Sequence, residues 1–387
     1  MPQDGGAPPQ PLSPPPPAAA PANEPARTTA TRADPTHAKM GGKAKGRRVL
    51  LTVFSGGDGF AQAALRPGTG DRWSPVGGVE DKPDIAALWD EEAQGHGKVL
   101  GDYEAVCAQL ERGDLLVPGG VIDAVVLTPP CQDYTTVNDA AAGEDGPTGK
   151  YMADLHRFVG LMKRRHRVKA YVLEEVVQVL PTEAFRKLVA VLRDANYQVA
   201  YGEAQFWLCG VPTTRTRLVL AALHTSYRKR PGPFRVPGLS EAGDAAVEVP
   251  QLGPILQAPE DVHPSLREDA GDLALFGSDH QQTALPAVQV GRMRGPGTNR
   301  YVYSVQAPAL TLRANIRKAE GLGGVTGMYL DPLGPRRLSP VEVLRLHDFP
   351  ETWASLPTAT VYHIVGNSVP VQWARAVLNM LDQELKQ

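Results

Sequence analysis

The sequence has little that would support several large classes of protein. Its 387 residues include three cysteines, Cys107, Cys131 and Cys209, too few and too far apart for a disulfide framework or a zinc cluster, and no metal site is expected. The formal net charge of −2 argues against a generally basic nucleic-acid coat protein, so any such contact must come from local basic surfaces. No run of about 18 apolar residues occurs, and the N-terminus lacks the apolar segment of a secretory signal. We therefore expect an intracellular protein that is neither secreted nor membrane-spanning.

Residues 1–46 form a tail rich in proline and alanine that has almost nothing to bury, so disorder is the default expectation. Seven basic residues and one acid, Asp34, lie between Arg27 and Arg48. Such a segment could be a nuclear address or a weak tether to DNA, whereas a solvated charged tail is the simpler interpretation.

From Arg48 onward, apolar runs alternate with helical periodicity, which predicts an α/β domain on a mainly parallel sheet. Buried strands are expected at 49–54, 73–79, 121–127, 168–173 and 218–223. Helical spacing occurs at 60–65, 151–162, 185–192, 339–347 and 371–385. The apolar-periodic stretch 103–110 would bury Cys107 as a small hydrophobic residue.

The alternating pattern stops near His224, and the chain from about 225 to 330 is irregular and rich in proline and glycine. Short strand-like pieces such as 301–305 occur there. No acid lies between His280 and Ala319, while six basic residues do: Arg292, Arg294, Arg300, Arg313, Arg317 and Lys318. The simplest organisation is an insert between two parts of one α/β domain, with segments 1–46, 47–224, 225–330 and 331–387.

A glycine-rich turn, Phe54-Ser55-Gly56-Gly57-Asp58-Gly59, joins the first strand to the first helix. Such a turn lets a ligand approach the backbone, although many are merely structural. Glu80 ends the second strand, where an acid can accept hydrogen bonds from ribose hydroxyls, and Asp102 follows the third, where it could accept from an adenine amine. Each acid alone is better explained as a helix cap or a solvated charge. Their order and spacing favour an adenosyl pocket.

Thr128-Pro129-Pro130-Cys131-Gln132 follows the strand 121–127, so two prolines would hold a thiol over the edge where α/β active sites lie. A structural cysteine in a proline turn explains the segment equally well. Glu174 and Glu175 close the next strand. An acidic pair is usually a solvated helix start, but here a carboxyl could hydrogen-bond a substrate held against the thiol.

Two further segments carry polar side chains toward the same domain. Arg215 and Arg217 are two residues apart on an extended segment and point to one face, as salt-bridge partners or as ligands for phosphate or base oxygen. Asn367 and Ser368, in Gly366-Asn367-Ser368-Val369-Pro370, precede the last helix and are expected to cap it, which is compatible with a ligand role.

Together these residues resemble the DNA cytosine-5 methyltransferase family over Arg48 to Gln387. The motifs match in the family's order, and so do the segments 306–312, 336–342 and 345–350. The resemblance implies a Rossmann-like S-adenosylmethionine-dependent methyltransferase domain at 47–224, a smaller target-recognition insert at 225–330 and a return to the catalytic domain at 331–387. S-adenosylmethionine would be bound by Phe54, Gly56, Gly59, Glu80, Asp102, Pro130, Asn367, Ser368 and Val369.

The resemblance further implies methyl transfer to C5 of a cytosine flipped out of duplex DNA. Cys131 would add to C6, which makes C5 enamine-like and divides one hard step into two easier ones. Glu174 would hydrogen-bond or protonate N3. Arg215 could hold the base oxygen and help keep the thiol ionised, with Arg217 completing the catalytic set. Contacts to DNA are expected from Gln132, Arg292, Arg294, Arg300 and Arg313.

Three positions depart from the family's pattern. Asp58 stands where the turn usually has another glycine, which puts an acid near the cofactor loop. Glu175 replaces the asparagine that usually follows the catalytic glutamate and braces the cysteine loop, and two adjacent carboxylates could raise one pKa and make activity low or pH-dependent. Thr213 replaces a glutamine before the arginine pair, a milder change.

Two other functions fit the same fold. One is a catalytically silent DNA-binding regulator or scaffold, which Asp58 and Glu175 would favour. The other is a transfer-RNA cytosine-5 methyltransferase, although the Cys-Phe-Thr signature of that branch is missing from 176–180. We expect a monomer located with double-stranded DNA, and a cognate restriction endonuclease as a partner if the chain serves restriction-modification.

Overall fold

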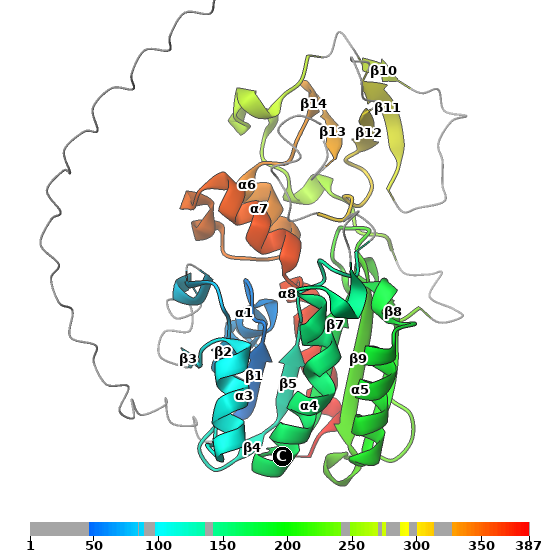
Figure 1. The fold of residues 1–387 in the computed structure, drawn as a ribbon. Helices are drawn as coiled ribbons and strands as arrows, with labels where there is room; N and C mark the ends of the chain where they lie inside the picture. The colour runs from blue at the N-terminus through cyan, green and yellow to red at the C-terminus, as the bar shows by residue number, and fades with distance from the viewer. Residues whose placement is uncertain are drawn as a thin grey trace, which may run out of the picture. The chain divides into compact units, whose positions relative to one another are not determined.

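Seven strands form a mixed sheet in the order β3-β2-β1-β5-β7-β9-β8 (Figure 1). Neighbours from β3 to β7 pair in parallel, and β9 runs antiparallel to both β7 and β8. The predicted strands are confirmed, although 121–127 and 168–173 each divide into two strands, and the sequence pattern did not predict β8. The bounds are β1 Arg48–Val53, β2 Trp73–Val79, β3 Lys98–Val99, β5 Ala124–Leu127, β7 Ala170–Glu175, β8 Tyr197–Gln205 and β9 Thr216–His224. Two short strands, β4 (Val121–Ile122) and β6 (Arg167–Val168), pair in parallel as a separate two-stranded sheet. In the sequence, β4 comes directly before β5 and β6 directly before β7.

This computed structural model describes residues 46–386 except 84, 89–96, 136–141, 241–247, 270–272, 276–286, 294–299 and 313–326. All of them belong to one compact unit, Met40–Gln387. Within these ranges no helix has the length and apolar character needed to cross a membrane. The tail expected at 1–46 lies outside the described residues, apart from Gly46.

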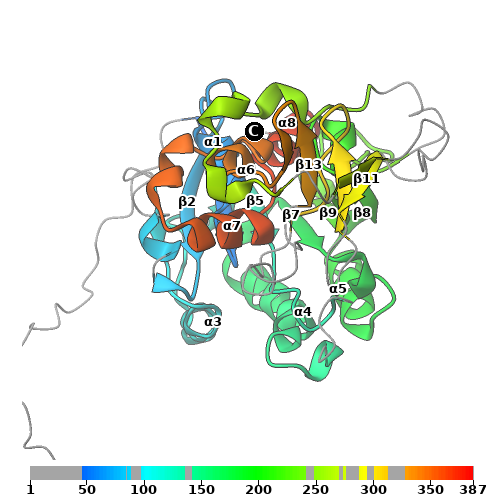
Figure 2. The ribbon, with the colours of Figure 1, turned by 90° about the horizontal axis from the view of Figure 1, so that it is seen from above.

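Helices cover both faces of the large sheet (Figure 2). One face packs against α3 (Tyr103–Arg112), α4 (Gly149–Arg165) and α5 (Glu183–Asp194), and the other against α1 (Gly59–Leu65) and α8 (Val371–Glu384). Side chains alternate between the faces along β1, so Leu50 joins one core and Leu51 the other. A strand buried on both faces is mostly apolar, which explains the nearly continuous apolar run at the start of the domain.

A second, five-stranded sheet follows in the order β10-β11-β12-β13-β14. Its strands are β10 Leu273–Leu275, β11 Gln289–Met293, β12 Arg300–Ser304, β13 Met328–Asp331 and β14 Gly334–Arg336. It has its own small core of Met293, Val302 and Met328. The boundary expected at residue 330 falls within β13, so we propose that the insert extends to residue 336, the end of β14.

A buried ionic cluster joins this second sheet to the C-terminal part of the chain. The fully buried guanidinium of Arg336 binds Asp331 (2.6 Å) and both carboxylate oxygens of Glu342 (2.7 and 2.9 Å). Glu342 also closes a capping box with Ser339 at the start of α6 (Pro340–Leu346). The direction of α6 as it leaves the sheet is therefore fixed by paired charges.

The structure corrects the expectation that Asn367 and Ser368 cap the last helix. Asn367 ends α7 (Thr358–Asn367), a helix that was not predicted, and α8 begins after Pro370 without any side-chain cap. The residue before a proline avoids the helical region, so Val369 separates the two helices. The Ser368 hydroxyl instead donates back to the Ile364 carbonyl (2.7 Å).

Candidate active site

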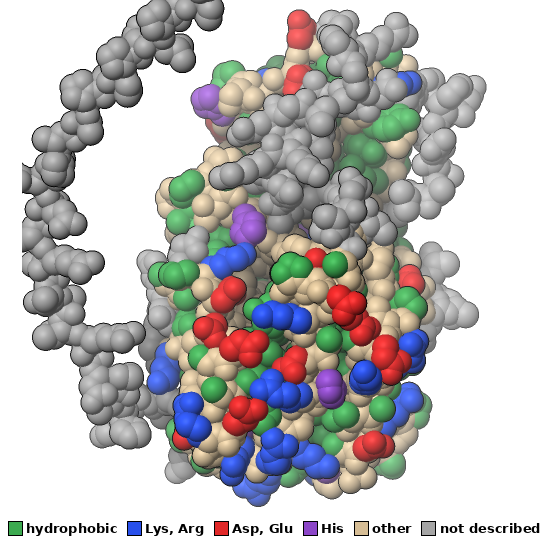
Figure 3. Space-filling model, viewed as in Figure 1, with side chains coloured by type: hydrophobic (Ala, Val, Ile, Leu, Met, Phe, Trp, Pro, Cys, Tyr) green, Lys and Arg blue, Asp and Glu red, His purple; other side chains and the backbone are tan. Residues whose placement is uncertain are grey.

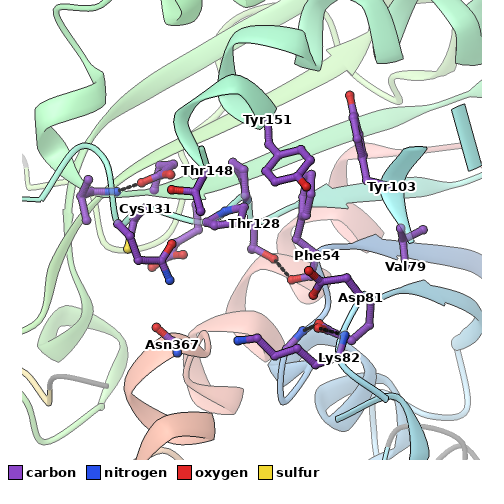
Figure 4. A pocket seen from close by; sticks show the side chains of 18 of the residues that line it. Phe54, Val79, Asp81, Lys82, Tyr103, Thr128, Cys131, Thr148, Tyr151 and Asn367 are labelled. Carbon is purple, nitrogen blue, oxygen red and sulfur yellow. Dashed lines mark hydrogen bonds between the residues drawn. The ribbon is translucent and has the colours of Figure 1, made fainter. Parts of the chain in front are cut away.

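A cavity of about 480 Å³ opens at the carboxyl ends of the parallel strands (Figure 4). Strand β1 has β2 on one side and β5 on the other, so this edge is the switch point where ligands of α/β sheets bind. Eleven of the predicted site residues line the cavity: Phe54, Gly56, Glu80, Asp102, Pro130, Cys131, Gln132, Glu174, Arg215, Arg217 and Asn367. The strand ends thus bring together residues that are far apart in the sequence.

The glycine turn is held by contacts from behind the cavity. Its backbone takes left-handed angles at Phe54 (φ 62°), Gly56 (φ 53°) and Asp58 (φ 48°). The Gly57 amide donates to Ser368 Oγ (3.0 Å), and a Cβ on Gly59 would lie 2.0 Å from the Val369 carbonyl oxygen. Gly59, Ser368 and Val369 were predicted to bind cofactor, but they are not among the residues that line the cavity. We assign them to bracing the turn against the α7–α8 connection.

We predict that Gly59→Ala lowers the free energy of unfolding by about 1–3 kcal/mol, because backbone must move to admit the methyl group. Urea unfolding measures this effect. Gly160→Ala is the matched control, since a Cβ there meets nothing within 4 Å and alanine favours a helix. Equal stability of Gly59→Ala and the native chain would contradict the close packing of this turn.

Asp58 is turned away from the cavity. Its carboxylate accepts hydrogen bonds from the Ala61 amide (2.8 Å), as N-cap of α1, and from the Thr52 hydroxyl (2.5 Å). The residue is 4% exposed and is not among those that line the cavity. This placement removes the structural reason for expecting the acid to weaken cofactor binding.

At one end of the cavity, Glu80 and Asp102 lie near three aromatic rings. Glu80 accepts from the Gly56 amide (2.7 Å), and burial raises the pKa of its carboxyl. Asp102 caps α3 by accepting from the Ala105 amide (2.7 Å). Asp102 is therefore a helix cap and Glu80 an acceptor for the glycine turn, and both also line the cavity.

Phe54 was predicted to bind cofactor, but sequence reasoning missed the two tyrosines that form an aromatic wall with it beside these acids. The Phe54 ring stacks on Tyr103 with centroids 4.9 Å apart and lies 5.3 Å from Tyr151. Figure 4 shows these rings toward one end of the cavity and Cys131 at the other. The tyrosines begin α3 and lie in α4, where their helical spacing indicated only core packing. The other lining residues that were not predicted as site residues are Val79, Asp81, Lys82, Glu104, Thr128, Pro129, Pro147, Thr148, Glu175, Val176 and Gly366.

At the other end, two guanidinium groups converge on one carboxylate oxygen. Arg215 Nη2 and Arg217 Nε each lie 3.3 Å from Glu174 Oε1. The alternation of an extended segment predicted that both arginines share a face, and this is confirmed. Arg215 also donates to the Gly366 carbonyl (3.0 Å) and is 2% exposed, so its position is fixed from two sides.

The loop before these arginines is attached to the insert. Thr213 is fully buried and forms a bridge with Ala309, whose amide donates to the Pro212 carbonyl (2.8 Å). Thr213 Oγ1 also donates to the Leu310 carbonyl (3.4 Å). The threonine that departs from the family's pattern therefore sits in a firm backbone junction.

The Cys131 thiol is half-buried, which opposes its ionisation. Burial raises the pKa of its thiol to about 11, and the nearby Glu175 adds to the rise, while Arg217 and Arg215 oppose it. Arg215 acts in the expected direction, since its charge lowers the pKa of the thiol, but desolvation of the thiolate outweighs the attraction of the guanidinium groups. On balance, these effects favour the neutral thiol.

Few of the predicted DNA contacts fall within the described residues. Gln132 lines the cavity. Arg292 lies in β11, half-buried, and its Nε makes no hydrogen bond with any described residue. Arg300 is described only as backbone of β12, and Arg294 and Arg313 lie outside the described residues. Their part in DNA contact stays a prediction.

The face formed by α3, α4 and α5 carries Lys and Arg side chains interspersed with Asp and Glu (Figure 3). Examples are the ion pairs of Arg157 with Glu111 (2.8 Å) and of Arg186 with Glu183 (3.0 Å). Mixed charges of this kind do not attract a polyanion strongly. We therefore do not expect nucleic acid to bind this face.

Comparison with known proteins gives a family and a fold. The model of the family "C-5 cytosine-specific DNA methylase" matches residues 51–383, and comparison with curated proteins gave no match. The Entamoeba histolytica methyltransferase EhMeth is 15% identical, with a TM-score of 0.61 over 87% of this chain and 98% of that one. The S. pombe Dnmt2 methyltransferase is 14% identical, with a TM-score of 0.58 over 87% and 99%.

A putative DNA modification methyltransferase encoded within an E. coli prophage is 15% identical, with a TM-score of 0.56 over 87% of this chain and 99% of that one. At such identities these likenesses show the fold alone. The α/β architecture with its largely parallel sheet thus matches methyltransferase folds, as the sequence predicted.

Proposed function

The chain belongs to the C-5 cytosine-specific DNA methylase family, and from this premise we propose that it methylates C5 of cytosine in duplex DNA, with S-adenosylmethionine as methyl donor. One observation carries the proposal. A single cavity contains the Cys131 thiol and the Glu174 carboxylate at one end, and acids with aromatic rings at the other. Nucleophile and methyl donor must meet in one site for this reaction, and the cavity supplies a place for each.

The residues at the aromatic end fit an adenosyl group. Glu80 could accept from ribose hydroxyls and Asp102 from an adenine amine, while the rings of Phe54, Tyr103 and Tyr151 offer apolar surface for a flat base. S-adenosylmethionine, when bound, supplies an electrophilic methyl group on a sulfonium sulfur. The glycine turn would let this ligand come close to the backbone at Gly56, which lines the cavity.

At the other end, the protein must overcome the weak nucleophilicity of cytosine C5. Addition of the Cys131 thiolate forms a sulfur–carbon bond at C6. The electrons of the C5=C6 bond move toward C5 and, through C4, place negative charge on N3. Glu174 hydrogen-bonds or protonates N3, where that charge accumulates. After methylation, a base such as water takes the C5 proton, the electrons of the C5–H bond re-form the C5=C6 bond, and the thiolate leaves as the C6–sulfur bond breaks. The base must leave the duplex stack to reach this cavity.

The arginine pair orients Glu174 for this task. Both guanidinium groups bind Oε1, so Oε2 takes no part in these contacts and can face the base. Their positive charges also favour a thiolate at Cys131, in opposition to burial. We propose that a bound base, by displacing water and presenting an acceptor to Arg215, completes the site.

Methyl incorporation from labelled S-adenosylmethionine into duplex DNA and into transfer RNA tests the proposal. We expect label in DNA, and bisulfite sequencing then gives the target site. Label only in transfer RNA would mean that transfer RNA, and not DNA, is the substrate. That outcome is compatible with the fold shared with Dnmt2. Label in neither would favour a silent DNA-binding protein. Monomeric state and a partner endonuclease stay predictions.

A further inference from the structure

Glu175 occupies an unusual position for a carboxyl group. It is the last residue of β7, only 2% exposed, and it lines the same cavity as Cys131 and Glu174. One oxygen, Oε2, accepts from the Val176 amide. The other, Oε1, is buried and makes no hydrogen bond with any residue that the structure describes.

An ionised carboxylate in this position would lack a counter-ion. The two arginines bind Oε1 of Glu174, and no salt bridge to Glu175 occurs among the described residues. Burying an unpaired charge costs far more free energy than burying a neutral carboxyl group. A neutral acid also has an O–H donor, which an ionised one lacks.

We propose that Glu175 is a positioning residue that acts through Cys131. While its carboxyl group is neutral it adds no negative charge beside the thiol, and when it ionises it opposes formation of the Cys131 thiolate. The inference rests on the proposed function, because the ease with which Cys131 ionises matters for catalysis only if Cys131 is the nucleophile. No other carboxyl group of the cavity combines such burial with an oxygen that lacks a partner among the described residues.

The groups that face Glu175 are Glu174 on β7, Arg215 and Arg217 from the segment that leads into β9, and Cys131 and Tyr134 from the loop after β5. Burial and the charge of Glu174 raise the pKa of Glu175 to about 8, against the hydrogen bond from Val176 and the arginines. The carboxyl is then mostly neutral at pH 7 and ionises as the pH rises through about 8. Cys131 loses its proton only afterwards, against the new negative charge.

The pH dependence of iodoacetamide alkylation at Cys131 tests this coupling, and mass spectrometry of the peptide separates it from Cys107 and Cys209. In Glu175→Gln, an isosteric neutral amide, we expect Cys131 to titrate at lower pH and to react roughly threefold to tenfold faster at pH 8.5–9, because a shift of about one pKa unit is tenfold. Glu203→Gln, an exposed carboxylate of β8 outside the cavity, should leave the profile unchanged.

The same pH dependence of Cys131 alkylation in the native chain and in Glu175→Gln would overturn the inference. A purely structural Glu175 would scale the rate at all pH values without moving the titration. If Glu175→Gln fails to fold, Glu175→Asn is the second neutral variant, with the same expected shift. Alkylation needs neither DNA nor cofactor, so a shifted titration without any methyl transfer would sink the proposed function alone, and methyl transfer without a shifted titration would sink this inference alone.

Discussion

Cys131→Ser is expected to lose methyl transfer to DNA by about 10³-fold or more, the scale seen when a catalytic nucleophile is removed. Serine keeps nearly the same volume, so the cavity should persist. Its hydroxyl is a far weaker acid than a thiol, and the burial that raises the pKa of Cys131 would disfavour an alkoxide further. The measurement is the initial rate of methyl incorporation into duplex DNA at saturating cofactor.

Cys209→Ser provides the matched control. This cysteine ends a 3-10 turn, Phe206–Cys209, packs beside a hydrophobic core and is not among the residues that line the cavity. We expect it to retain nearly full activity. A Cys131→Ser variant with more than a tenth of native activity would remove the covalent step from the account.

Glu174→Gln is expected to reduce methyl transfer by about 10²–10⁴-fold, the range for removal of a general acid or base. The amide cannot protonate N3, and it leaves Arg215 and Arg217 without their shared carboxylate. The same change should make Cys131 more reactive toward iodoacetamide, because the negative charge of Glu174 adds to the raised pKa of the thiol.

These two effects have opposite signs, and a role at N3 predicts both. A misfolded variant would also expose its thiols, so alkylation of the buried Cys107 must stay as slow as in the native chain. Glu203→Gln again serves as control, since its exposed carboxylate lies on β8 away from the cavity. Methyl transfer by Glu174→Gln within about threefold of the native rate would contradict the assignment of Glu174.

Much of the site could be predicted because parallel strands end at one edge of their sheet. Motifs that follow β1, β2, β5 and β7 must therefore converge, whatever the length of chain between them. Strand β8 escaped prediction because it is mostly half-exposed and lacks a continuous apolar run. Helix α7 escaped prediction because helical periodicity was evident at 339–347 and 371–385 but not in the segment between them, whose sequence TATVYHIVGN is rich in β-branched residues.

Contacts between distant segments could not be predicted from local pattern. The hydrogen bond between Ser368 and Gly57 joins residues 311 positions apart, so a capping role looked sufficient for the serine. The direction of the Asp58 carboxylate depends on Thr52 and the first turn of α1. The state of Cys131 depends on a balance between burial and four nearby charges, which no motif encodes.

Trapping the covalent intermediate tests the central claim most directly. Duplex DNA containing 5-fluorocytosine at the target site lacks the C5 proton whose loss would release the enzyme, so the bond between Cys131 and C6 should persist. With S-adenosylmethionine present, we expect a denaturant-stable adduct for the native chain, mapped by mass spectrometry to the Cys131 peptide and absent from Cys131→Ser. A native chain that binds both DNA and cofactor yet forms no adduct would contradict the account.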